Sequence, residues 1–181
     1  MSEPGRIECL CGPMFSGKTS KLQRRLRRAQ REKRVVQVFK PVTDDRYDAE
    51  CVCSHDKDKC AATVFDPTHP EEILEKLRPD ADVVGIDEVM WCAPPIVTVL
   101  DAMAERGIRV IVAGLDLDFK GDPFGPMPLI LCIADEAVKL AAVCECGKPA
   151  TRSQRLTKSK ERDEVGGADK YAAACRVCHT I

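Results

Sequence analysis

Residues 11–20, CGPMFSGKTS, contain the first group of side chains whose types and spacing suit chemistry. A glycine followed after four residues by Gly-Lys-Thr is typical of a loop whose backbone N–H groups hold a polyphosphate, while the next helix points its positive N-terminus at it. In such loops the lysine reaches the β- and γ-phosphates and the threonine hydroxyl ligates Mg²⁺. The residues expected to bind the phosphates and the metal are Gly12, Pro13, Met14, Phe15, Ser16, Gly17, Lys18 and Thr19.

An acidic pair follows the apolar run at residues 83–86. Asp87 stands where phosphate-loop enzymes carry the carboxylate that organises the metal, directly or through water. Glu88 is either a solvated residue at the end of a strand or a base. A phosphate acceptor needs no base because it is already an anion, whereas a hydroxyl or a water benefits from one. These residues therefore predict transfer of a phosphate to an alcohol or to water, and they leave both acceptors open.

Short apolar runs alternate with amphipathic stretches along the chain. The expected strands cover residues 7–11, 35–39, 81–86, 108–113 and 137–143, and the expected helices cover 18–31, 70–78 and 94–106. Strands separated by helices predict an α/β fold of the P-loop NTPase type, with a mostly parallel sheet and helices on both faces. The polar stretch 42–62 is expected to be a long loop.

Composition and charge narrow the function classes. The formal net charge is −1, so nothing in the overall charge predicts a nucleic-acid or membrane partner, and the arginines of residues 18–31 are expected to form a solvated helix face. No apolar run is long enough to span a bilayer, and the first residues resemble no signal peptide. Eleven cysteines, an odd number, favour reduced thiols over a disulfide framework. We therefore expect a cytoplasmic protein.

The composition changes after Cys144, where charged residues become frequent and aliphatic residues rare. We expect two parts: a nucleotide-binding α/β domain over residues 1–142 and a small C-terminal segment over residues 143–181.

Five motifs in order along the chain carry a resemblance to a known family. They are GPMFSGKTSKL, GIDE, GLDLDFKGDPFGPMP, KLAAVCECGKPATRSQRL and GGADKYAAACRVCH. Together they resemble the cytosolic, zinc-bearing type of thymidine kinase, from residue 7 to residue 179. The resemblance implies transfer of the γ-phosphate of ATP to the 5′-hydroxyl of thymidine, which gives thymidine monophosphate. It also implies a homotetramer and feedback inhibition by thymidine triphosphate.

The resemblance assigns roles to individual residues. Glu88 would accept the proton of the 5′-hydroxyl, and Arg46 would lie near the phosphates with Lys18; Asp44 belongs to the same matched stretch. The residues expected at the nucleoside are Met14, Leu115, Phe119, Phe124, Ser153, Val165, Gly166, Gly167 and Tyr171. Apolar side chains would surround the 5-methyl group, while residues 165–171 would close over the nucleoside as a lasso. An apolar pocket discriminates between two ligands that differ by one methyl group by about 1–3 kcal/mol. Deoxyuridine, which lacks the 5-methyl group, is therefore expected to be a poorer substrate.

Two pairs of cysteines flank this closing segment, and they are expected to bind a structural zinc ion. The four expected ligands are Cys144, Cys146, Cys175 and Cys178. Two such pairs in a segment too small to bury its own core are typical of tetrahedral zinc. Most relatives space the first pair as C-x-x-C, whereas this chain has Cys-Glu-Cys, and His179 is an alternative to Cys178. A second, weaker candidate set is Cys51, Cys53, His55 and Cys60.

One departure from the family pattern lies beside the acidic pair. The family usually continues with Gln-Phe-Phe where this chain has Met90-Trp91-Cys92. Because methionine cannot replace the hydrogen bonds of an amide, weaker phosphate positioning is expected. Two rival functions stay open from the residues alone: an ATPase in which Glu88 activates water, and a nucleic-acid-binding module built on the basic helix and the zinc segment.

Overall fold

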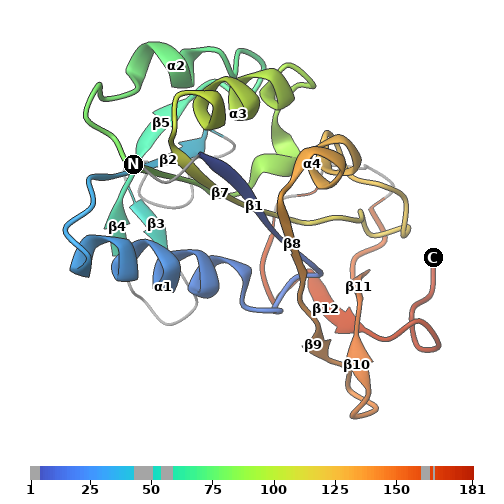
Figure 1. The fold of residues 1–181 in the computed structure, drawn as a ribbon. Coiled ribbons are helices and arrows are strands. Elements are labelled where there is room, and N and C mark those ends of the chain that lie inside the picture. Colours follow the sequence, from blue (N-terminus) through green and yellow to red (C-terminus); the bar gives the residue numbers. More distant parts are fainter. Residues whose placement is uncertain (1–4, 43–50, 54–58, 160–163, 165) are drawn as a thin grey trace.

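The structure, a computed structural model, describes residues 5–42, 51–53, 59–159, 164 and 166–181. Its centre is a six-stranded sheet in the order β5-β2-β6-β7-β1-β8, in which all neighbouring strands are parallel. The strands are β1 (Arg6–Cys11), β2 (Val36–Pro41), β5 (Thr63–Phe65), β6 (Val83–Ile86), β7 (Arg109–Gly114) and β8 (Glu136–Lys139). The predicted α/β fold with a parallel sheet is confirmed (Figure 1).

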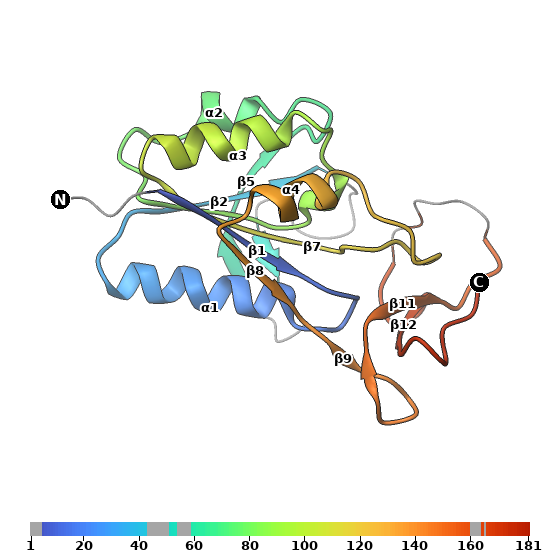
Figure 2. The ribbon, with the colours of Figure 1, turned by 45° about the vertical axis from the view of Figure 1, so that its right-hand side comes forward.

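Helices cover both faces of the sheet, as predicted. They are α1 (Lys18–Arg31), α2 (Glu72–Lys76), α3 (Ile96–Glu105) and α4 (Met127–Ile133), with a 3₁₀ turn, η1, at Val89–Trp91. In Figure 2, α1 lies below the sheet, whereas α2, α3 and α4 lie above it. None of these described helices is long and apolar enough to cross a membrane.

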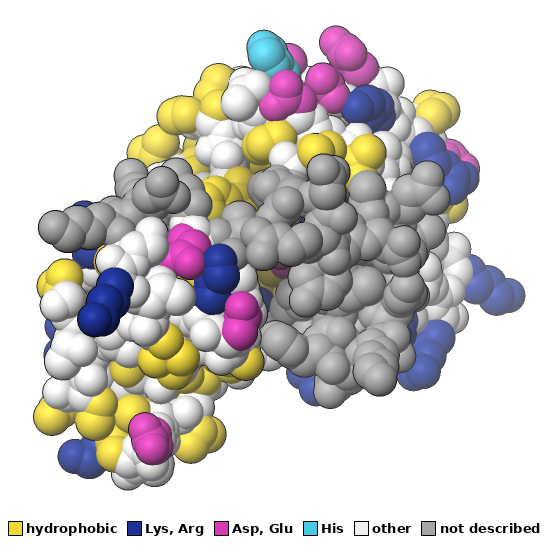
Figure 3. All heavy atoms as spheres, turned by 180° about the vertical axis from the view of Figure 1, so that it is seen from behind, with side chains coloured by type: hydrophobic (Ala, Val, Ile, Leu, Met, Phe, Trp, Pro, Cys, Tyr) yellow, Lys and Arg dark blue, Asp and Glu magenta, His cyan; other side chains and the backbone are white. Residues whose placement is uncertain are grey.

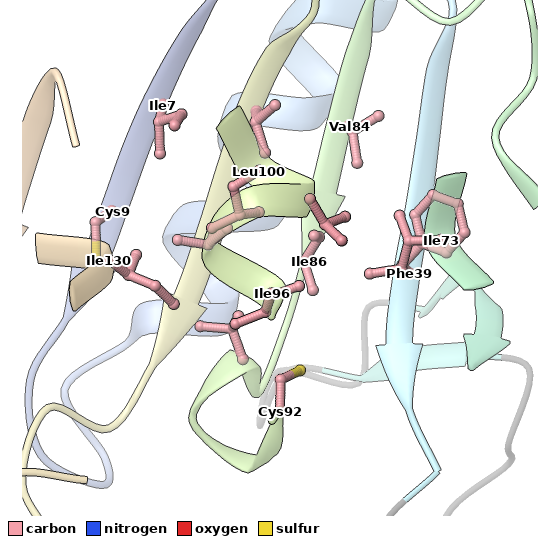
Figure 4. Close-up of a cluster of buried hydrophobic side chains, with 14 of the residues drawn as sticks. Ile7, Cys9, Phe39, Ile73, Val84, Ile86, Cys92, Ile96, Leu100 and Ile130 are labelled. Atoms are coloured by element: carbon pink, nitrogen blue, oxygen red, sulfur yellow. The ribbon is translucent and has the colours of Figure 1, made fainter. Parts of the chain in front are cut away.

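The two faces carry separate apolar clusters. Above the sheet, Ile96 and Leu100 of α3 pack with Ile86 and Val84 of β6, and Figure 4 shows these side chains between helix and strands. Below it, Leu22, Leu26 and Ala29 of α1 pack on the strands. The spacing of these apolar residues, three or four apart, places them on one helix face and thus specifies which side of α1 meets the sheet.

Gly85 lets α1 lie close to the middle of the sheet. A Cβ atom at this position would lie 2.7 Å from Cδ1 of Leu26, closer than side-chain atoms pack. The absence of a side chain on β6 therefore sets the distance between α1 and the strand that leads into the acidic pair.

A smaller part follows β8 at one end of the sheet (Figure 1). It contains two antiparallel pairs, β9 (Ala142–Val143) with β10 (Pro149–Ala150), and β11 (Arg152–Arg155) with β12 (Tyr171–Ala174). The predicted boundary between residues 142 and 143 falls inside β9, and the division into two domains stays a prediction. On the face seen in Figure 3, both acidic and basic side chains occur among the described residues.

Two expectations about secondary structure were wrong. Residues 137–143 are not one strand, because β8 ends at Lys139 and the chain leaves the sheet at Leu140, whose N–H donates to the Cys11 carbonyl at 2.7 Å. The stretch 42–62 is not only loop, because it contains the antiparallel strands β3 (Cys51–Cys53) and β4 (Lys59–Ala61). Strand β5 and helix α4 were not predicted at all.

Candidate active site

The phosphate loop connects β1 to α1 at the carboxyl edge of the sheet. Gly12 has φ 137° and Gly17 φ 80°, conformations that favour glycine. A Cβ atom on Gly12 would lie 2.3 Å from the Leu140 carbonyl oxygen, so only glycine fits beneath the chain that leaves β8. The Ser16 hydroxyl and the Lys18 ammonium both donate to the Pro13 carbonyl, at 2.8 and 2.6 Å. Hydrogen bonds within the loop thus hold residues 13–18 in a compact turn.

The partly buried Lys18 and the buried Asp87 lie close enough for their charges to interact. Burial lowers the pKa of Lys18 from 10.5 to about 8, although the nearby Asp87 and Asp116 carboxylates oppose the shift. Burial also raises the pKa of Asp87, which is 5 % exposed, while a hydrogen bond from the side chain of Thr19 opposes this. The loop lysine, the helix threonine and the acidic residue after β6 therefore meet, as the sequence predicted from their spacing.

Glu88 adopts an unusual backbone conformation at the start of η1. Its φ is 55° and its ψ 35°, in the left-handed region, and its N–H donates to Asp87 Oδ1 at 3.0 Å. A non-glycine residue in this region carries strain of about 1–3 kcal/mol, and such strain clusters at functional sites. The turn directs the chain from β6 into the wall of a cavity that Glu88 itself lines.

A cavity of about 120 Å³ lies beside the phosphate loop. Most of its wall is apolar, and at one side the Trp91 ring meets the Phe124 ring edge-on at 4.9 Å between centroids. The lining residues are Met14, Glu88, Met90, Trp91, Leu115, Leu117, Asp118, Phe119, Phe124, Ser153, Glu164, Gly166 and Tyr171. Residues far apart in sequence thus form one pocket with a carboxylate near the phosphate loop.

Four cysteine side chains of the C-terminal part come together. The sulfur atoms of Cys144, Cys146, Cys175 and Cys178 all lie within 4.8 Å of one another, and Cys146 Sγ lies 3.7 Å from Cys175 Sγ. A tetrahedral zinc ion with Zn–S bonds of about 2.3 Å places its sulfur ligands about 3.8 Å apart. Backbone N–H groups, first that of Cys178, lower the pKa of Cys175 to about 6, which favours the thiolate that binds a metal. The donor set and its dimensions fit zinc.

Residues 5–179 match the sequence model of a family described as "Thymidine kinase". The chain belongs to the thymidine kinase family. The match covers nearly all of its length and includes the phosphate loop, the acidic pair and the four cysteines. Members of this family phosphorylate thymidine with ATP, so the protein is an enzyme, an ATP-dependent thymidine kinase.

The structure of this thymidine kinase brings most of the predicted nucleoside residues together. The predicted residues that line the cavity are Met14, Leu115, Phe119, Phe124, Ser153, Gly166 and Tyr171. Gly167 is not in the lining; its N–H is bonded to the Asp169 carboxylate at 3.0 Å. Arg46, Asp44 and Val165 lie outside the described residues.

The structure decides between Cys178 and His179 as a member of the cysteine cluster. The ring Nε2 of His179 lies 2.7 Å from the Phe119 carbonyl oxygen, and the sulfur of Cys178 belongs to the cluster. His179 thus contacts the backbone of a residue that lines the cavity. The second candidate set cannot be followed, because the side chains at residues 51–61 are outside the described part of the chain.

Several residues of the kinase site were not predicted from the sequence. Met90 and Trp91 both line the cavity. From the sequence they were noted only as part of a departure from the family motif, and no place in the site was predicted for them. Glu164 and Asp118 line the cavity as well. Each of these residues lies within three positions of a predicted site residue: Met90 and Trp91 follow Glu88, Glu164 precedes Gly166, and Asp118 precedes Phe119. Closeness in sequence could have suggested them, but it does not tell which neighbour faces a pocket.

Proposed function

We propose that the cavity holds the thymidine and that Glu88 accepts the proton of its 5′-hydroxyl as the γ-phosphate is transferred. The observation that carries this proposal is the position of Glu88: it follows Asp87, which contacts the phosphate-loop threonine, and it also lines the cavity. A base placed between the two substrates fits an alcohol acceptor.

The phosphate side of the proposal uses the loop residues. Lys18 would move from the Pro13 carbonyl to the β- and γ-phosphates, where its positive charge offsets the charge of the transferring group. Thr19 and Asp87 would hold Mg²⁺, the Thr19 hydroxyl directly and Asp87 directly or through water. The ion supplies charge neutralisation at the phosphates when it is bound. Arg46 would act near the phosphates as well, a role that rests on the family resemblance.

The nucleoside side would combine an apolar wall with polar contacts. Leu115, Phe119 and Phe124 offer the apolar surface that a 5-methylpyrimidine fills, and Tyr171 and Gly166 belong to the C-terminal segment proposed to close over the base. Backbone groups of Gly166 and Val165 would read the polar edge of the base, while Gly167, which lies outside the lining, would hold the turn through its bond to Asp169. The four cysteines would hold a structural zinc ion that fixes both ends of this segment.

Three further properties follow from the family and stay proposals for this chain. The kinase would work as a homotetramer, thymidine triphosphate would inhibit it by occupying both substrate sites, and it would act in the cytoplasm. The near-neutral charge and the free thiols of the described cysteines are compatible with that location.

The experiment separates chemistry from binding at Glu88. Glu88→Gln removes the base but keeps the size of the side chain, so kcat should fall at least about a hundredfold while the dissociation constant of thymidine changes little. Glu105→Gln, on the exposed end of α3, is the matched control and should leave kcat unchanged. If Glu88→Gln retains most of the wild-type kcat, the proposal is wrong.

A further inference from the structure

Arg155 is a buried cation at the back of the cavity wall. It is the last residue of β11, is 7 % exposed and lies opposite Tyr171 of β12 in the register of this strand pair. Burying a charge is costly unless the surroundings compensate it. An arginine kept in this position therefore calls for a structural or functional reason.

The guanidinium group contacts both sides of the cavity at once. Its central carbon lies 3.6 Å from the centre of the Phe119 ring, a stacked cation–π contact with the segment that follows β7. One of its nitrogens donates to the Tyr171 hydroxyl at 2.8 Å. Phe119 and Tyr171 both line the cavity. Arg155 thus connects the wall supplied by the α/β part to the wall supplied by the C-terminal part.

The contacts of Arg155 continue into the closing segment. The Tyr171 hydroxyl donates to the Glu164 carbonyl at 2.6 Å, and the Glu164 carboxylate lies 3.7 Å from the Arg155 Nε. Thr157 and Lys170 hold the same carboxylate, at 2.6 and 3.0 Å. The network therefore fixes the backbone of Glu164 next to the cavity, two residues before Gly166.

We propose that Arg155 is a positioning residue for the nucleoside: by stacking on Phe119 and hydrogen-bonding Tyr171 it sets the spacing between the two walls of the cavity. The inference rests on the proposed placement of thymidine in this cavity. The polar atoms of Arg155 point to Tyr171, Glu164 and the Ser159 carbonyl, so the effect of Arg155 on nucleoside binding passes through these neighbours.

The chemistry of the contact requires arginine. A flat guanidinium can stack on a ring and donate to a hydroxyl in its own plane at the same time, whereas the compact ammonium of lysine cannot do both. Arg155→Lys keeps the charge but removes this double contact. Because the two walls would lose their fixed spacing, thymidine should bind more weakly while the phosphate loop keeps its geometry.

The test compares Arg155→Lys with Arg152→Lys on the same strand, whose side chain donates to the Thr151 carbonyl and lies outside the cavity lining. Thymidine binding is measured by calorimetry without ATP, together with KM for each substrate, kcat, zinc content and melting temperature. For Arg155→Lys we expect the dissociation constant and KM of thymidine to rise about tenfold. The KM of ATP, kcat and zinc content should stay within about twofold. Arg152→Lys should match the wild type.

Equal thymidine binding by Arg155→Lys and the wild type would overturn the inference. So would a parallel loss of both KM values, kcat and melting temperature, because that pattern indicates a merely structural role. If Arg155→Lys does not fold, Tyr171→Phe decides: it removes only the hydroxyl, and it should raise the thymidine KM about threefold without changing that of ATP. Wild-type protein that binds no thymidine would instead refute the proposed function, and the inference with it.

Discussion

The backbone N–H of Met14 donates a hydrogen bond of 3.0 Å to the hydroxyl of Ser153, 139 residues further along the chain. Met14 belongs to the phosphate loop and Ser153 to β11, and both line the cavity. The bond joins the phosphate loop to the strand pair proposed to cover the nucleoside. The proposed positions of the two substrates are therefore connected by a contact between the α/β part and the C-terminal part.

Ser153→Ala should weaken the enzyme through this contact. It removes the acceptor of a partly buried N–H, so the free energy of unfolding should fall by about 1 kcal/mol, and the thymidine KM should rise severalfold. Thr98→Ala, on the exposed face of α3, is the control. Denaturant unfolding and initial rates measure both effects, and equal values for the two variants would contradict the prediction.

Loss of one cysteine of the cluster should remove the metal. The wild-type chain is expected to carry about one zinc ion per chain, and Cys146→Ser should lose it because a structural zinc site needs all four ligands. Cys132→Ser, at an exposed position on α4 outside the cluster, should keep full zinc content. Elemental analysis after dialysis provides the readout. Zinc retained by Cys146→Ser at the wild-type level would exclude this site.

The lowered pKa of Lys18 predicts an alkaline limit to ATP use. The charged ammonium binds phosphates, and with a pKa of about 8 its charge is lost as the pH rises through that value. Since kcat/KM for ATP reports the ionisation of the free enzyme, it should decline above about pH 8. Lys18→Arg should be less active but should lack this decline, because a guanidinium stays charged.

The lowered pKa of Lys18 also makes the stability of the fold depend on pH. Burial penalises the charged form of Lys18, and this penalty is fully present below about pH 8. It should be relieved as the pH rises from about 8 toward the ordinary value of 10.5, so this group makes a contribution to stability that increases with pH over that interval. A kcat/KM profile for ATP that stays flat up to pH 10 would contradict a lowered pKa.

Gly85→Ala should destabilise the fold by overpacking. The new methyl group would lie 2.7 Å from Cδ1 of Leu26, which is 1 % exposed and has little room to move, so a loss of about 1–3 kcal/mol is expected. The loss of stability caused by Gly85→Ala should be smaller when Leu26→Ala is also present, because the shorter side chain leaves room for the new methyl group. Additive losses in the double variant would show that the contact with Leu26 is not the cause.

The central part of the fold could be predicted from the sequence because its signals are local. Continuous apolar runs marked the buried parallel strands, and the spacing of Leu22, Leu26 and Ala29 marked the buried face of α1. Strand β5 has only three residues, too few for periodicity to show. Helix α4, MPLILCI, is a short apolar run that the sequence pattern does not distinguish from a strand. The end of β8 depends on a contact between Leu140 and the phosphate loop, which is not a local signal.

The same distinction holds for the site. The phosphate loop and the acidic pair were predicted because each occupies one short motif with fixed spacing. The cavity is assembled from five separate segments, so the family resemblance, not the spacing, brought Leu115 and Ser153 into the prediction. Arg155 was missed because its partners Phe119 and Tyr171 are distant in sequence and only the fold brings the three together.

The most direct test is to follow ATP consumption by the purified kinase with Mg²⁺, with and without thymidine, and to identify the product. We predict turnover only when thymidine is present, one ADP for each thymidine monophosphate, and the new phosphate on the 5′-oxygen. Thymidine-independent release of inorganic phosphate at a comparable rate would contradict it, because water would then be the acceptor that Glu88 serves.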